Sequence, residues 1–77
     1  MGNRDTGVVL HIDDPTSHDQ REEFRDELLA LDGVMAAAYH DERPHLMVIV
    51  YDANIIKSIE FVNAAKNRGW RAELVGP

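Results

Sequence analysis

The chain has 77 residues with fourteen acidic and eight basic side chains, so its formal net charge is −6. This length supports one domain over residues 1–77 without a deep enclosed pocket, because so short a chain buries only about 60% of its unfolded surface. The negative charge repels phosphate groups and so argues against nucleic acid as a partner. The sequence has no cysteine, which excludes disulfides, thiolate metal sites and thiol nucleophiles.

The first half of the chain predicts a strand followed by a helix. Residues 7–13 alternate between two faces, which is the period of a half-buried strand, and the inward set is Val8, Leu10 and Ile12. A turn cluster at residues 13–17 follows. Helical spacing then places an apolar stripe toward the core, and the charged side chains from Arg21 to Glu27 face water. The stripe is Phe24, Leu28 and Leu31, and Gly33 ends the helix.

The second half predicts a hairpin, a helix and a last strand. Residues 34–40 form a strand, residues 41–44 a polar connection, and residues 46–51 an apolar, β-branched run typical of a central strand. Residues 52–54 cap a second helix, which Gly69 ends before a short strand at 71–75. The stripe of that helix is Ile55, Ile59, Val62 and Ala65.

This βαββαβ order predicts the fold class. It is typical of an α+β, ferredoxin-like sandwich, in which a four-stranded antiparallel sheet carries both helices on one face. The first and third strands then lie side by side at the centre of the sheet. We therefore expect one sheet face to pack on the helices and the other to be open.

The open face of the sheet is a candidate interface. If Leu46, Val48 and Val50 point to the helices, the outward set on the central strands is Val9, His11, Met47, Ile49 and Tyr51. That set is more apolar than a solvent-exposed sheet face normally is, which predicts a protein partner or a homodimer through this face. The alternative is that scattered surface hydrophobic residues need no partner.

Four segments together resemble the heavy-metal-associated domains of copper chaperones and metal-transporting ATPases. Leu31-Asp32-Gly33-Val34 is similar to the family's Leu-x-Gly-Val at the end of the first helix, and residues 14–20 occupy its Gly-Met-Thr-Cys-x-x-Cys loop without a gap. Residues 48–52 resemble its third strand, and Gly69-Trp70-Arg71-Ala72 resembles its Gly-aromatic-x-Ala segment. The resemblance covers nearly the whole chain and implies a ferredoxin-like fold and a metal site in the loop.

The loop departs from that family at the ligands themselves. Ser17 and Gln20 stand where the resemblance places the two cysteines, and a hydroxyl or an amide cannot replace a thiolate toward Cu(I) or Zn(II). Ser17-x-x-Gln20 instead predicts a capping box, in which each side chain satisfies the other's backbone N–H. The degenerate metal loop comprises Thr16, Ser17, His18, Asp19 and Gln20, with Trp70 at the aromatic position that the resemblance places beside the loop.

Metal binding without sulfur is the second hypothesis. His18 and Asp19 could hold a divalent ion weakly, since one imidazole and one carboxylate suit such ions. His11, His40 and His45 are expected to be surface residues, and the alternative is that His40 and His45, which flank the hairpin, approach each other as a weak two-imidazole site. Met35 and Met47 are interpreted as packing residues.

These patterns favour a binding role over catalysis. No serine, histidine and acid follow a known catalytic motif, and there is no phosphate-binding glycine loop, so we expect no enzyme and no cofactor. The leading hypothesis is a protein-interaction or adaptor module that has lost thiolate metal binding. A small-ligand sensor is a third possibility. The chain start lacks a hydrophobic signal and no segment could span a bilayer, which predicts a cytoplasmic protein without membrane insertion.

Overall fold

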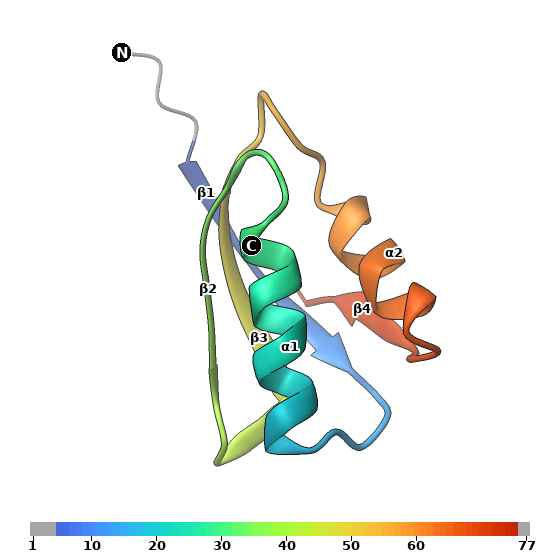
Figure 1. Ribbon diagram of the computed structural model, residues 1–77. Helices are drawn as coiled ribbons and strands as arrows, with labels where there is room; N and C mark the ends of the chain where they lie inside the picture. Colours follow the sequence, from blue (N-terminus) through green and yellow to red (C-terminus); the bar gives the residue numbers. More distant parts are fainter. Residues whose placement is uncertain (1–4, 76–77) are drawn as a thin grey trace.

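Four strands and two helices follow one another along residues 5–75, the part of the chain that this computed structural model describes (Figure 1). The elements are β1 (Asp5–Ile12), α1 (His18–Leu29), β2 (Val34–His40), β3 (Arg43–Asp52), α2 (Ile59–Asn67) and β4 (Ala72–Leu74). The strands form one antiparallel sheet in the order β2-β3-β1-β4, and both helices lie over the same face (Figure 1). The predicted ferredoxin-like sandwich is confirmed, with β1 and β3 at its centre.

The register between β1 and β3 decides which side chains enter the core. Val8 pairs with Ile49 and Leu10 pairs with Met47, and residues paired across two strands share a face. Met47, Ile49 and Tyr51 are therefore buried with Val8, Leu10 and Ile12, at exposed fractions of 8% or less. The expectation that these three β3 residues lie on the open face was wrong.

The error has a physical cause. Residues 46–51 are apolar at every position, so alternation cannot show which face of this strand is inward. The assignment of β1 is confirmed, because its alternation is visible in the sequence and Val9 and His11 lie away from the core. The open face therefore keeps Val9 and His11 and takes Leu46, Val48 and Val50 from β3 in place of the predicted residues.

Helix α1 packs through Phe24 and Leu28, both fully buried, as predicted. It ends at Leu29, earlier than expected, and Leu31 packs against the core from beyond the helix. Gly33 adopts a φ of 95°, and a Cβ atom there would lie 2.9 Å from side-chain atoms of Ile55 and Ile56. Glycine is thus required where the β3–α2 connection crosses this turn.

Helix α2 begins later than the sequence predicted. The side chain of Asp52 accepts a hydrogen bond from the Asn54 N–H, and its carbonyl accepts from Ile55 and Ile56, so this segment forms a turn and not a first helical turn. The helix starts at Ile59, and Ile55 and Ile59 are at least half exposed. The packed stripe is instead Phe61, Val62, Ala64 and Ala65, and Gly69, with a φ of 85°, ends the helix as predicted.

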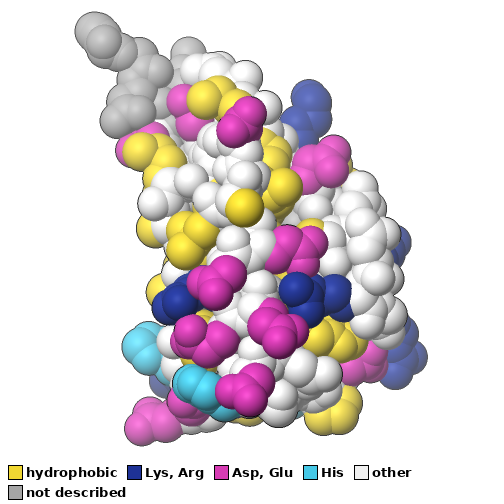
Figure 2. Space-filling view, viewed as in Figure 1, with side chains coloured by type: hydrophobic (Ala, Val, Ile, Leu, Met, Phe, Trp, Pro, Cys, Tyr) yellow, Lys and Arg dark blue, Asp and Glu magenta, His cyan; other side chains and the backbone are white. Residues whose placement is uncertain are grey.

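Neither helix within residues 5–75 is long and apolar enough to cross a membrane. Acidic side chains outnumber basic ones across the face seen in Figure 2, where the helices lie. On this face the acidic side chains are spread along the molecule and are not confined to one end.

Neighbouring residues of β3 provide a matched test of the register. Ile49→Lys should destabilise the protein by about 3–5 kcal/mol, because it leaves an unpaired charge in the core. Val48→Lys should change the free energy of unfolding by no more than about 1 kcal/mol, since Val48 is 42% exposed. Urea denaturation of both variants measures the difference. The register would be contradicted if Ile49→Lys kept the stability of the wild type while Val48→Lys unfolded the protein.

Candidate functional site

The loop before α1 is closed by its own hydrogen bonds. Ser17 Oγ accepts from the Gln20 N–H at 3.1 Å, and Gln20 Oε1 accepts from the Ser17 N–H at 2.8 Å. Both bonds of the predicted capping box are therefore present, with Ser17 as the N-cap of α1. The two side chains at the positions of the family's cysteines already have partners within the loop.

Arg21 connects this loop to the β2–β3 hairpin. Its Nη1 donates to the carbonyl oxygen and to Oγ1 of Thr16, at 2.6 and 3.0 Å, and its Nη2 donates to Asp41 Oδ1 at 2.9 Å. The Arg21 side chain is only 8% exposed, so the expectation that it faces water was wrong. A buried guanidinium needs such partners, because an unpaired charge away from water is costly.

His18 lies at the same junction. Its Nδ1 is 3.0 and 3.1 Å from the two carboxylate oxygens of Asp41, and its ring meets the Tyr39 ring edge-on at a centroid distance of 5.9 Å. The Tyr39 hydroxyl donates to Glu22, and the Arg21 guanidinium lies 5.8 Å from the Tyr39 ring centre. We call the residues His18, Arg21, Tyr39 and Asp41 the hairpin cluster.

Charge in this cluster shifts three pKa values. The hydrogen bond that His18 donates to Asp41 raises the pKa of His18 above its usual 6.5, and the bonds that Asp41 accepts from His18 and then Arg21 lower the pKa of Asp41 below its usual 3.8. The bond to Glu22 raises the pKa of Tyr39 to about 12. The His18 contribution to stability is thus present below pH 6.5 and lost as pH rises through the folded-state pKa, whereas that of Asp41 is lost below about pH 3.8.

The hypothesis of a divalent ion held by His18 and Asp19 stays a prediction. Asp19 lies in the first turn of α1, where a carboxylate stabilises the positive end of the helix dipole. The carboxylate within 3.0 Å of the His18 ring is that of Asp41, which Arg21 also binds. A protonated His18 in this ion pair is a poor ligand, since only the neutral imidazole coordinates a metal.

Trp70 is buried and packs on the body of α1. Its ring meets Phe24 edge-on at a centroid distance of 5.4 Å, and the Arg68 guanidinium lies 5.6 Å from its centre. The adjacent Arg71 holds the start of the loop, because its carbonyl accepts from the Asp13 N–H at 2.8 Å and its N–H donates to Asp14 Oδ2 at 3.2 Å. Trp70 thus closes the core beside α1.

A second group of polar side chains was missed by the sequence reasoning. His11, Asp13 and Glu73 bring three possible ligand atoms within 4.8 Å of one another, the one such group of three found among residues 5–75. The cross-strand pair His11 and Glu73 creates it, and no spacing along the chain reveals that β1–β4 register. His45 stacks on His11 at a centroid distance of 5.7 Å, so the structure places it beside this group.

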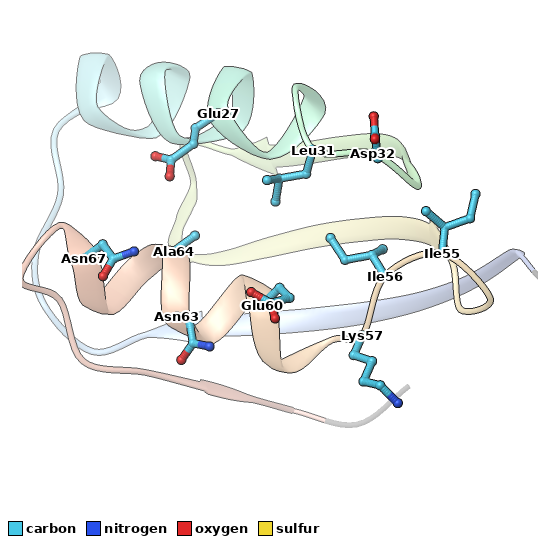
Figure 3. A pocket seen from close by; sticks show the side chains of 10 residues that line it. All are labelled: Glu27, Leu31, Asp32, Ile55, Ile56, Lys57, Glu60, Asn63, Ala64 and Asn67. Carbon is cyan, nitrogen blue, oxygen red and sulfur yellow. The ribbon is translucent and has the colours of Figure 1, made fainter.

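A shallow groove separates α1 from α2 and the β3–α2 connection. Figure 3 shows Glu27 of α1 and Leu31, just beyond that helix, on one side and Ile56 and Ala64 on the other, with carboxylate, amide and lysine groups around the rim. These lining side chains do not include a nucleophile paired with a base, the arrangement that covalent catalysis requires.

Known proteins match this chain by structure and not by sequence. No family model and no curated protein matches it. A copper binding domain from HMA7, a P-type ATPase, superposes with a TM-score of 0.80 at 17% identity, over 91% of this chain and 93% of that one. For oxidized MerP from Ralstonia metallidurans CH34 the TM-score is 0.79 at 14% identity, over 91% and 96% of the two chains. This chain shares their fold.

A third structure, described as "Crosstalk between Cu(I) and Zn(II) homeostasis", superposes with a TM-score of 0.76 at 11% identity, over 91% of this chain and 99% of that one. The predicted resemblance to heavy-metal-associated domains is thus confirmed as a likeness of fold. The loop residues of this chain do not fit the thiolate site of that family. The chain has no cysteine, and the oxygens of Ser17 and Gln20 are engaged by backbone N–H groups.

The contact between His18 and Asp41 leads to a prediction about the pKa of His18. In Asp41→Asn the pKa of His18 should fall toward 6.5, because its hydrogen-bonded carboxylate is the largest cause of the upward shift. Asp19→Asn is the control and should lower it far less, since Asp19 is the smallest cause named. Proton NMR titration of the His18 ring measures both. An equal fall in the two variants would show that Asp41 does not hold the ring.

Proposed function

We propose that this chain is a non-enzymatic interaction domain that keeps the heavy-metal-associated fold and binds a partner protein through its open sheet face. The observation that carries the proposal is the apolar character of that face. We define it by the side chains that the strand register turns away from the helices, which are Val9, Ala36, Ala38, Leu46, Val48, Val50 and Val75. Val48 and Val75 are 42% and 50% exposed.

This surface is more continuous than scattered exposed hydrophobic residues. Val9 pairs with Val48, and Val48 pairs with Ala38 on the next strand, so these side chains form a row across three strands. Val50 and Ala36 form a second row beside the first. Contiguous apolar patches of this kind mark interaction surfaces in soluble proteins. The predicted interface is kept, with corrected residues on β3.

The charges around the face favour a partner over a second copy. Asp5 and Asp52 pair across the strands at one end of the face, and Glu73 lies beside His11 at the other. A second copy would place acidic ends against acidic ends on a chain with a net charge of −6. A partner with an apolar patch bordered by lysine or arginine would match both features. The occupant that we propose is therefore a protein of that chemistry.

Site-specific cross-linking tests the proposal. A photoreactive residue at Val48 should cross-link one defined protein in the source cells, whereas the same residue at Ile59 should not. Ile59 is the matched control, because it is an apolar residue 50% exposed on the helix side. With the purified partner, Val48→Lys should weaken binding by about 30-fold or more, Ile59→Lys should have little effect, and added salt should weaken binding.

Two results would overturn the proposal. Cross-linking of the same proteins from both positions would mean that the open face is ordinary surface. Cross-linking of Val48 to a second copy alone, with a dimer in sedimentation that Val48→Lys dissociates, would replace the partner with a homodimer.

A further inference from the structure

The group formed by His11, Asp13 and Glu73 lies where β1 meets β4. His11 and Glu73 are cross-strand neighbours, which places their side chains on the same, open face of the sheet. Asp13 is two residues beyond His11, and its backbone is fixed because its N–H donates to the Arg71 carbonyl at 2.8 Å. Two strands and a held loop residue therefore bring one imidazole and two carboxylates together.

The distances within this group suit adjacent ligands of one ion. His11 Nδ1 lies 2.9 Å from Asp13 Oδ1, and one ligand atom from each of the three residues falls within 4.8 Å of the others. Bonds of about 2.0–2.2 Å from a tetrahedral Zn²⁺ to nitrogen and oxygen place neighbouring ligand atoms about 3.4 Å apart. Small rotations of Asp13 and Glu73, which are both exposed, would complete such a site.

The Nδ1 atom of His11 supports this interpretation independently. It is enclosed by protein, and within residues 5–75 it has no hydrogen-bond partner in good geometry. The contact to Asp13 is short, yet it does not have the direction of a hydrogen bond. A polar atom cut off from water without a partner is costly, and a cation between the imidazole and the carboxylates would remove that cost.

His45 adds a second nitrogen beside the group. Its Nδ1 lies 2.7 Å from the Ile12 carbonyl oxygen, which can only accept, so Nδ1 carries the proton. The neutral ring then has its lone pair on Nε2, and this is the tautomer that a carbonyl fixes in metal-binding histidines. The ring stacks on His11 at 5.7 Å and an interplanar angle of 17°.

We propose that His11, Asp13 and Glu73 form a site for a first-row divalent cation of the Zn²⁺ class, with His45 adjacent to it. Imidazole with carboxylates is a donor set that suits such ions, and it needs no sulfur. The site is distinct from residues 14–20, because His11 and Glu73 lie on the sheet, Asp13 precedes those residues, and His18 is bound to Asp41. It does not depend on the proposed partner, since the chain alone supplies its ligands.

Titration of the chain with Zn²⁺ alone, monitored by calorimetry and by NMR of the histidine rings, tests the site. The wild type should bind one Zn²⁺ and shift the His11 resonances. His11→Ala and the isosteric Glu73→Gln should each weaken binding by at least about tenfold. His18→Ala and Asp19→Asn are the controls and should bind as the wild type does. Circular dichroism checks that each variant is folded.

Three results would overturn the site. They are no binding by the wild type at millimolar Zn²⁺, unchanged binding in folded His11→Ala and Glu73→Gln, and loss of binding in His18→Ala instead. The last result would assign the ion to His18 in the loop. None of these results bears on the cross-linking at Val48, so the two proposals fail separately.

Discussion

The burial of one guanidinium organises the end of the molecule that holds residues 14–20 and the β2–β3 hairpin. Arg21 sits almost wholly out of water, and a cation in that position must be paired and hydrogen-bonded. Thr16 in the loop and Asp41 in the hairpin provide the partners. Asp41 in turn holds His18, so the loop, the first turn of α1 and the β2–β3 connection are joined by side chains of this chain alone.

The loop at residues 14–20 is closed by hydrogen bonds, so this chain has the fold of the matched domains without a thiolate site in that loop. A fold does not fix a function, and the structural matches at 11–17% identity carry only the fold. In this chain hydrogen bonds engage Ser17 and Gln20, the residues that the resemblance aligns with two cysteines, and an ion pair joins the neighbouring Arg21 to Asp41. The binding surfaces that we propose lie on the sheet, where an apolar face is bordered by carboxylates and imidazoles.

Local patterns in the sequence predicted what depends on local structure. The capping box at Ser17 and Gln20, the alternation of β1 and the helix end at Gly69 follow from neighbours along the chain, and each is confirmed. The inward face of β3 could not be predicted, because its apolar run has no alternation and only the pairing of Val8 with Ile49 sets it. The burial of Arg21 and the meeting of His11 with Glu73 likewise depend on contacts between distant segments.

Hydrogen bonds engage Ser17 and Gln20, the two residues that the resemblance aligns with the cysteines of a metal loop. The most direct measurement is the Cu(I) affinity, under reducing conditions, of a variant that combines Ser17→Cys with Gln20→Cys, compared with the wild type and with Ser17→Cys alone. We predict that the double variant binds Cu(I) at least about 100-fold tighter than the wild type or Ser17→Cys alone, because two thiolates then face one ion. It should also be less stable without metal by about 1 kcal/mol, since the N-cap is lost. An affinity equal to that of the wild type would contradict the account.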